Sequence, residues 1–421
     1  KDIYKSPLKL FYSRSIAAPE GAVKLTKAGG AVRYGLLYAR DAAPPDSVQD
    51  DGFSVSEREN ADDYYGTTSV ARLQWDLSKE TTLGFMFLDR GLLRANKGAY
   101  VEGAPREAGN QVIGLDGQSF ITPQFKAVFG AFLSQSSDLD EQALTGHALM
   151  SKLMFREDAW RLMADFFRVT EGFRSEAGYL PRDGGYNQFF IKFDGYHRSE
   201  NPWAREVSPG IWVGAHVGDD GEVSERRYGV NTYWRFGPRI WLIPVYNRIA
   251  ERIDGAWLDT NRFRFFFGVQ TFRSFDVKVG FRAGDEIIRS DELLEEGQAP
   301  YVGASFQPEV VLNLRPLPQL TLGASARQRI IWDAVGGEEL SNEPIARVSG
   351  RWFFSRAFDV RGILEWDELD GVLSGDVLLS YEPQPGTVAY VGYRHGGRLE
   401  GEGPLLEERA FFMKLSLLNL L

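Results

Sequence analysis

Residues 256–285 contain two long runs in which apolar and polar side chains alternate. In the first run Phe263, Phe265, Phe267 and Val269 alternate with Arg262, Arg264, Gly268 and Gln270. In the second run, after a turn at Arg273-Ser274, Phe275, Val277, Val279, Phe281 and Ala283 alternate with Asp276, Lys278, Gly280, Arg282 and Gly284. Successive side chains of a strand point to opposite faces, so each run predicts a strand with one apolar and one charged face. Strands of soluble sheets usually have about 5–6 residues, whereas transmembrane barrels need about 9–11, apolar outside and polar inside. This hairpin therefore predicts part of a transmembrane β-barrel.

The same alternation recurs along the whole chain. Paired runs are expected at 21–27 with 31–40, 66–78 with 81–90, 110–136, 143–170, 207–217, 222–253, 256–288, 299–331, 339–368 and 371–396, with a first strand within 1–20 and a closing strand near the C-terminus. Short turns that alternate with long loops are typical of outer-membrane barrels. We therefore predict an all-β fold, a transmembrane antiparallel up-and-down β-barrel of about 22 strands (about 18–24), as a single domain over residues 1–421. A β-propeller would require repeats of about 40–50 residues, and the sequence has none.

Composition agrees with this fold and excludes several functions. Aromatic residues make up 13% of the chain and Gly numbers 45, which suits interfacial aromatic side chains and tight turns. No stretch approaches the run of about 18 apolar residues that a membrane helix requires. The chain has no Cys, which excludes disulfides, thiolate metal sites and covalent haem attachment, so we expect no cofactor on this chain. Its net charge of −10 argues against a nucleic-acid partner.

Short segments spread from residue 11 towards the C-terminus resemble one family of outer-membrane barrels. They are Phe11-Tyr12-Ser13-Arg14, Gly21-Ala22-Val23-Lys24-Leu25-Thr26, Gly114-Leu115-Asp116, Gly172-Phe173, Gly178-Tyr179-Leu180-Pro181-Arg182, Ser380-Tyr381-Glu382-Pro383 and Pro385-Gly386-Thr387. Together they resemble the family known as domain of unknown function 5916, whose members often follow a carbohydrate-binding-module-like domain of the family-nine type. The resemblance implies a bacterial outer-membrane location and an N-terminal periplasmic domain outside this chain. It implies no catalytic residues, because none is assigned in that family. The start at Lys1, without a signal peptide, agrees with a mature form, a trimmed form or the tail of a longer precursor.

Charged residues recur at the positions that the alternation assigns to the barrel interior. They are Arg72, Asp76, Arg161, Asp165, Lys192, Asp194, Arg262, Arg264, Asp276, Lys278, Arg282, Asp359, Arg361 and Glu365. As a pore lining, these residues would select a solute or contact a partner. If they only keep the inner wall hydrated, they would form cross-strand ion pairs that each contribute little to stability. For a single residue the second interpretation is favoured, whereas together they predict an aqueous lumen.

The expected width of the lumen raises the question of what fills it. Barrels of about 16–18 strands leave a channel, and those of about 22 strands normally hold a plug. The chain has no spare globular segment, and its loops of roughly 15–25 residues are short for a plug. Either loops fold inward or another protein occupies the lumen. We therefore predict a non-enzymatic barrel that forms a polar-lined pore, or the sleeve around a partner protein or translocated substrate. Its expected partners are outer-membrane lipid and a protein in or at the lumen.

Two alternatives to this function stay open. One is the barrel component of a porin–cytochrome-type electron conduit, in which the haem would belong to the partner, since the four His are scattered at 147, 197, 216 and 395. The other is a surface carbohydrate-binding or hydrolytic barrel. The carboxylates Glu365, Asp367, Glu368 and Asp370 resemble a paired-acid site, but the run enters a loop, and the sequence has no nucleophile motif.

Loops and Trp residues give three further predictions. Asp50-Asp51-Gly52 and Asp219-Asp220-Gly221-Glu222 carry the ligand type of calcium, although Asp-Gly is first a turn signal. The loops at 41–65 and 171–185 are the expected constriction or gate. Six Trp are expected in the interfacial girdles of the barrel rather than in a sugar-stacking track, namely Trp75, Trp160, Trp234, Trp241, Trp352 and Trp366.

Overall fold

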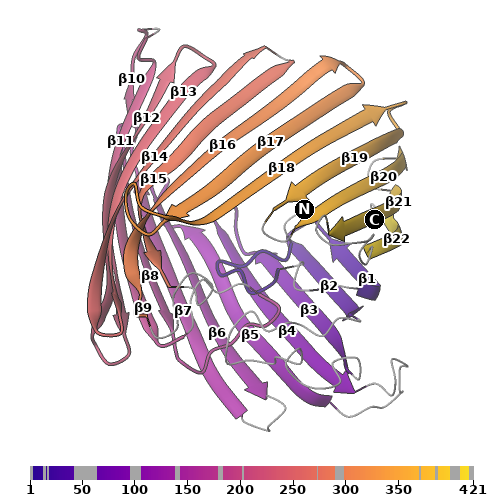
Figure 1. Ribbon diagram of the computed structural model, residues 1–421. Helices are drawn as coiled ribbons and strands as arrows, with labels where there is room; N and C mark the ends of the chain where they lie inside the picture. The colour runs from indigo at the N-terminus through magenta and orange to yellow at the C-terminus, as the bar shows by residue number, and fades with distance from the viewer. Residues whose placement is uncertain are drawn as a thin grey trace. The chain divides into compact units, whose positions relative to one another are not determined.

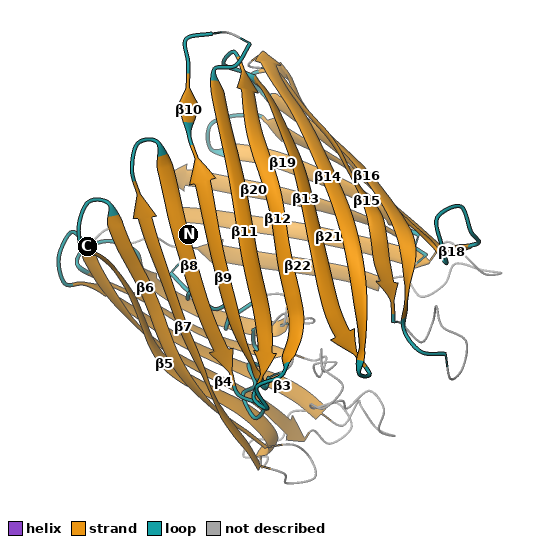
Figure 2. Cartoon of the chain, turned by 90° about the vertical axis from the view of Figure 1, so that its left-hand side faces the viewer, coloured by secondary structure: helices purple, strands orange, loops and turns teal. Residues whose placement is uncertain are grey.

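The structure, a computed structural model, describes most of the chain. The described ranges are 3–12, 16, 19–41, 64–94, 106–137, 143–178, 184–201, 203–272, 274–289, 298–368, 371–384, 387–398 and 408–416. Within these ranges the chain consists of strands, turns and loops (Figure 2), and none of it is a helix that is long and apolar enough to cross a membrane. Predicted features at 42–63, including Asp50-Asp51-Gly52, and at 179–183 lie outside the described residues.

The described residues form 22 strands in one antiparallel sheet. The strands are β1 Pro19–Lys27, β2 Val32–Asp41, β3 Tyr64–Asp76, β4 Thr81–Arg94, β5 Arg106–Phe120, β6 Phe125–Ser137, β7 Ala143–Arg156, β8 Trp160–Val169, β9 Tyr186–Gly195, β10 His197–Arg198, β11 Glu206–Gly218, β12 Val223–Phe236, β13 Ile240–Ile253, β14 Ala256–Phe272, β15 Phe275–Ile288, β16 Tyr301–Leu317, β17 Leu320–Trp332, β18 Glu339–Phe353, β19 Phe358–Asp367, β20 Val372–Gln384, β21 Thr387–Arg398 and β22 Glu408–Ser416. Tyr196 alone separates β9 from β10. The longest strands, β14 and β16, have 17 residues each, more than the about 9–11 that cross a bilayer.

Strands that follow one another in the chain pair with each other. The first of two compact units, Lys1–Phe193 with Trp212–Arg226, contains the pairs from β1 to β8. The second unit, Asp194–Ile211 with Arg227–Leu421, contains the pairs from β13 to β22. In Figure 1 both series appear as neighbouring arrows, indigo to magenta in the first unit and red to yellow in the second. Such nearest-neighbour pairing is the up-and-down topology that the hairpin pattern predicts. The prediction of a single domain stays a prediction.

The links between strands differ in length at the two ends of the second unit. At one end, called the short-turn end below, two to four residues join β12 to β13, β14 to β15, β16 to β17, β18 to β19 and β20 to β21. At the other end the links range from the two residues Asp254 and Gly255 to the twelve of 289–300. Asp254 and Gly255 have φ angles of 50° and 83°, as a two-residue type I′ hairpin turn requires. The expected regular alternation of short turns and long loops is therefore wrong here, because Asp-Gly makes a tight turn at the long-loop end.

The sheet of the first unit has one exposed apolar face and one covered face. Large apolar side chains are exposed on the apolar face, among them Leu73, Leu83, Ile113, Leu115, Leu133, Leu149 and Leu153. The opposite face contributes a buried cluster of Val70, Met86, Leu88, Val112, Phe132, Ala148 and Val169. Residues 3–12, here the N-terminal segment, and residues 171–178, here the covering loop, pack on this face and add Leu10, Phe173 and Ala177 to the cluster. The strand expected within residues 1–20 is therefore wrong for residues 3–12, which form no strand; the first strand begins at Pro19.

Replacing Phe132 with Ala should lower the stability of the folded protein by about 3–5 kcal/mol. Phe132 is only 1% exposed, and its removal leaves a cavity beneath the covering segments. Thermal unfolding in detergent, followed by the electrophoretic shift between folded and unfolded protein, measures the change. Leu133→Ala is the matched control, because Leu133 is 61% exposed on the apolar face, and it should shift the midpoint much less. Equal shifts would contradict the packing of the covered face.

Candidate functional site

Polar side chains of the sheet hold the covering loop by its backbone. The Asn110 amide donates to the Arg174 carbonyl at 3.1 Å and accepts from the Glu176 N–H at 3.1 Å. The Ser134 hydroxyl accepts from the Arg174 N–H at 3.0 Å, and Arg90 donates to the Glu176 carbonyl at 3.1 Å. Buried backbone groups need such partners, because leaving them unpaired costs free energy. The covering loop is thus bonded to β4, β5 and β6 as well as packed on them.

The N-terminal segment is joined to the covering loop. The Tyr12 N–H donates to the Ala177 carbonyl at 2.7 Å, and the Ser175 hydroxyl donates to the Leu10 carbonyl at 3.1 Å. A glycine in β7 permits the close approach of the loop to the sheet: a Cβ at Gly146 would lie 2.1 Å from the Phe173 nitrogen. The two segments therefore form one cover over the covered face.

A buried ion pair crosses the covered face. Arg72 of β3 donates two parallel hydrogen bonds to Asp116 of β5, at 2.6 and 2.7 Å, and the two residues are only 2% and 5% exposed. The guanidinium group passes over Gly84 of β4, where a Cβ would lie 2.5 Å from an Arg72 nitrogen. Bidentate geometry of this kind is the strongest form of an arginine–carboxylate contact. Arg72 was predicted to line a pore, and here it is enclosed by protein.

The other predicted interior residues of the first unit are less buried. Asp76 pairs with Arg33 at 2.5 Å, and Asp165 pairs with Lys152 at 3.2 Å. Arg161 lies on the same face of β8 as Asp165, by the register of β7 with β8. Lys192 alternates with the exposed Ile191 and Phe193 of β9. All of them lie opposite the apolar face, as predicted.

The second unit has an exposed apolar face and a polar face. Phe263, Phe267, Val279, Val310, Val348, Leu364 and Val377 are exposed on the apolar face. The register places the charged residues predicted for the barrel interior on the polar face. They are Arg262, Arg264, Asp276, Lys278, Arg282, Asp359, Arg361 and Glu365. Asp194, also in this unit, is buried and alternates with the exposed Phe193.

The polar face carries further charges that the sequence analysis left out. They are Glu286, Glu309, Arg315, Arg327, Arg329, Glu343, Arg347, Arg351, Asp376 and Arg394. Strict alternation counted from Asp276 and Asp359 along the paired strands would have found them. Many of these charges form ion pairs, such as Arg351 with Asp359 at 2.7 Å and Arg347 with Glu365 at 3.2 Å. Cations nevertheless outnumber carboxylates on this face, although the whole chain has a net charge of −10.

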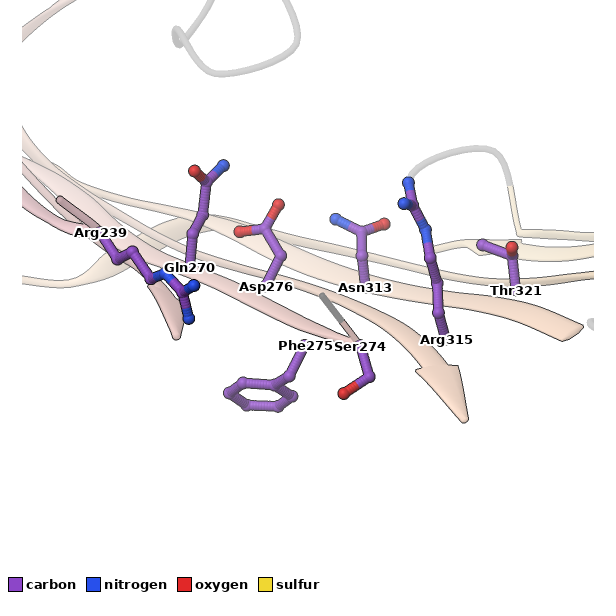
Figure 3. Close-up of a pocket in the computed structure, with 8 residues that line it drawn as sticks. All are labelled: Arg239, Gln270, Ser274, Phe275, Asp276, Asn313, Arg315 and Thr321. Carbon is purple, nitrogen blue, oxygen red and sulfur yellow. The ribbon is translucent and has the colours of Figure 1, made fainter. Parts of the chain in front are cut away.

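A pocket of about 560 Å³ opens at the short-turn end of β14 to β17. Its lining residues are Arg239, Gln270, Ser274, Phe275, Asp276, Asn313, Arg315 and Thr321. Figure 3 shows Gln270, Asp276, Asn313 and Arg315 projecting on one side of the strands and Phe275 on the other. Amide, carboxylate and guanidinium groups thus face the same space, and the pocket suits a hydrated, polar solute.

The structure also describes the expected calcium loop at Asp219-Asp220-Gly221-Glu222 and part of the expected paired-acid run. The Asp220 carboxylate accepts from the Glu222 N–H at 2.8 Å, and Asp219 pairs with Arg168 at 3.5 Å, so this loop is a capped turn. Among the described residues, no three His, Asp or Glu side chains lie close enough together to hold a metal ion. Asp370 of the expected paired-acid run lies outside the described part of the chain.

The Trp prediction is wrong at one position. Trp75 and Trp352 are exposed on the apolar faces, 51% and 39% respectively, where an interfacial girdle would be. Trp241 instead pairs with Gly268, which is opposite Lys278 in the next strand. Trp241 therefore lies on the polar face, where its indole ring covers the space that Gly268 leaves open.

Comparison by sequence gives no relatives, since no family model and no curated protein matches the chain. Comparison by structure gives many. The siderophore receptor PirA from Pseudomonas aeruginosa is similar with a TM-score of 0.60 and 10% identity, over 95% of this chain and 78% of the receptor. The outer membrane transporter YddB from Escherichia coli is similar with a TM-score of 0.59 and 10% identity, over 94% of this chain and 74% of the transporter. A chain of the FpvAI–pyocin S2 complex is similar with a TM-score of 0.55 and 11% identity, over 90% of this chain and 65% of that chain.

These similarities identify the fold. At 10–11% identity they show architecture alone, and that architecture is the antiparallel β-barrel of bacterial outer membranes. The predicted fold class is confirmed, and the predicted outer-membrane location agrees with it. In this fold class the polar side of each strand faces the lumen and short turns face the periplasm. The resemblance to domain of unknown function 5916 stays a prediction.

Replacing Asp116 with Asn should destabilise the protein by about 3–5 kcal/mol, because it leaves the buried Arg72 charge without its partner. Asp76→Asn is the matched control: its pair with Arg33 is about one-third exposed, and partly exposed pairs contribute at most about 1 kcal/mol. Thermal unfolding of both variants in detergent measures the difference. Equal effects would contradict the burial of the Arg72–Asp116 pair.

Docking of the covering loop should depend on pH through Glu176. Burial raises the pKa of this carboxyl from 4.5 to about 7, although the positive charges of Arg90 and Arg174 oppose the shift; Arg90 also faces Asp41. The Glu176 carboxyl therefore binds its proton more tightly when the loop is docked than when it is undocked. Docking is therefore strongest below about pH 4.5, weakens by up to about 3 kcal/mol as the pH rises to about 7, and is constant above that.

Hydrogen exchange of residues 171–178 at pH 5 and pH 8, corrected for the chemical exchange rate, measures this dependence. Protection should be lower at pH 8 in the native protein. The Glu176→Gln variant, which is neutral at both values, should show equal protection. A variant with the same pH dependence as the native protein would exclude Glu176 as the cause.

Proposed function

We propose that this chain is a transport barrel of the bacterial outer membrane. Polar solutes pass along the polar face of the second unit, and the chain's own cover occupies the covered face of the first. The observation that carries the proposal is the cover itself, made of the N-terminal segment and the covering loop. The cover favours the pore, because a loop that folds inward is the alternative to a protein partner in the lumen.

The chemistry of the covered face supports this choice. A face that receives a partner protein has to be accessible before the partner arrives. Here Val70, Met86, Val112 and Phe132 are nearly inaccessible beneath segments of the same chain, and four hydrogen bonds fasten the covering loop to the strands. Expelling this cover would expose a large apolar surface to water, which is unfavourable.

The polar face of the second unit supports an aqueous pathway. Removing its guanidinium and carboxylate groups from water would cost free energy, so this face favours a water-filled space beside it. At the short-turn end, the periplasmic end in this fold class, the pocket around Asp276 and Arg315 provides a polar mouth. A hydrated solute would therefore meet hydrogen-bonding groups along its path.

A sleeve around a partner protein, including the porin–cytochrome-type conduit, is the second candidate. It is supported by the charged polar face, on which a partner of complementary charge would bind. Purification of the native protein by a tag on this chain in mild detergent separates the two functions. A stoichiometric second protein, absorbing as haem in the conduit version, would favour the sleeve, and a barrel that purifies alone would favour the pore.

Conductance in planar bilayers tests the pore. The native barrel should conduct, and the double variant Asn110→Ala with Ser134→Ala should conduct more or fluctuate more, because it removes three of the hydrogen bonds that hold the covering loop. Ser119→Ala is the matched control, since Ser119 bonds to Thr81 near a turn and not to the covering loop. A native barrel without conductance would contradict the pore, and a double variant identical to the control would contradict the role of the cover.

A further inference from the structure

Two arginines lie directly opposite each other on the polar face of the second unit. Arg264 of β14 pairs in register with Arg282 of β15. Side chains directly opposite in an antiparallel pair have Cβ atoms about 4.5–5.5 Å apart, and like charges at this position are destabilising. Arg264 experiences the repulsion of Arg282 and also that of Arg262, its neighbour on the same face. A face that only has to be hydrated needs no such pair, because the neutral polar side chains of Gln or Ser would bind water without like-charge repulsion.

The carboxylates nearby are already engaged by other cations. Glu309 is bonded by Lys278, and Glu286 lies 3.6 Å from Arg262 and 3.3 Å from Arg329. Glu343 lies 3.7 Å from Arg329 and accepts from the Ser341 hydroxyl at 2.7 Å. Within the described part of the chain, Arg264, Arg282 and Arg327 form no ion pair with a carboxylate. Three guanidinium groups on one face are therefore left without an ion pair to a carboxylate, although Glu309 is in register with Arg327.

Two of these arginines, Arg282 and Arg327, line a hollow in the polar face, and Arg264 is the register partner of Arg282. A pocket of about 250 Å³ is lined by Arg282 of β15, by Gln307 and Glu309 of β16, and by Arg327 and Arg329 of β17. Arg282 is in register with Gln307, and Glu309 with Arg327. Neighbouring strands about 4.8 Å apart thus present Arg264 of β14, Arg282 of β15 and the Gln307 amide of β16 in register, and Arg327 of β17 follows two residues along, opposite Glu309. These four residues are called the row below. The row offers hydrogen-bond donors from every strand, together with three positive charges.

We propose that this row, Arg264, Arg282, Gln307 and Arg327, binds a small oxyanion that carries several negative charges on phosphate or carboxylate groups. The planar guanidinium group donates paired hydrogen bonds that match the oxygens of both groups. A multivalent anion neutralises the opposed arginines together, so their mutual repulsion is relieved when it binds. Glu309 and Glu343 also line the pocket, so they disfavour anions that are too large to stay away from them. The site deepens the proposed transport function, on which it rests, by naming the class of solute.

Titration calorimetry of the purified barrel in detergent, with inorganic phosphate and with citrate at low ionic strength, tests the site and distinguishes its two chemistries. The native protein should bind at least one of them, and Arg264→Gln with Arg282→Gln should weaken that binding by about tenfold or more, since charge-assisted bonds are lost. Arg394→Gln is the matched control, because Arg394 lies on the same face but pairs with Asp376 at 2.8 Å. Native protein that binds neither anion, or a double variant that binds like the control, would overturn the proposal.

Thermal unfolding provides the second readout and controls for folding. In buffer without multivalent anions the double variant should unfold at the native temperature or above it, because the like-charge pair is gone. The bound anion should raise the midpoint of the native protein and not that of the double variant. Arg327→Gln, which leaves the opposed pair in place, should show an intermediate loss of binding.

These experiments separate the failure of the site from the failure of the transport function. The titration requires no conduction, so binding in a barrel that does not conduct would overturn the pore and keep the site. Conductance in a barrel that binds neither phosphate nor citrate would keep the pore and overturn the site.

Discussion

Every strand of this protein has to satisfy its backbone hydrogen bonds with neighbouring strands while its two faces meet different surroundings. Hydrocarbon offers no partner to an N–H or C=O group, so strands that cross it must pair on both sides. The nearest-neighbour registers, such as the unbroken one from Ile240 with Val269 to Ile253 with Ala256, meet this requirement. Because the side-chain period of a strand is two, the same pairing sorts Phe263 and Arg264 onto opposite faces. The apolar surface, the polar face and the sites on it all follow from this constraint.

The two units use the face opposite the apolar one in different ways. In the first unit it includes apolar residues, such as Met86 and Phe132, that water would not solvate, and residues 3–12 and 171–178 bury them. Some polar groups there are enclosed as well, so Arg72 needs Asp116 and the covering loop needs Asn110. In the second unit the face carries many charges, with apolar side chains such as Trp241 and Ile243 among them. A cover would have to desolvate those charges at high cost, whereas water stabilises them in place.

Arginine sets the character of the polar face. Most of its carboxylates are taken up by pairs such as Arg351 with Asp359 and Lys278 with Glu309, which leave the face neutral locally and positive in sum. The opposed pair of Arg264 and Arg282 is a local cost that ion pairing does not remove. Binding sites commonly keep such unfavourable arrangements in the free protein, because the ligand relieves them. The proposed anion site would link the electrostatics of this cross-strand pair to the class of solute that the barrel carries.

Alternation in the sequence is enough to predict most of the strands, the face on which their charged residues lie, and the fold class. Those are local properties: alternation around Phe265 or Val277 is visible within a few residues, and it placed Arg72, Asp165, Lys278 and Arg361 on the correct face. The tertiary structure alone decided which charges meet and what covers them. Arg72 finds Asp116 at a separation of 44 residues and across an intervening strand, and Trp241 turns to the polar face over Gly268. A repeat of two residues excludes register shifts of one residue, but it carries no information about the docking of distant segments, which depends on packing against the sheet.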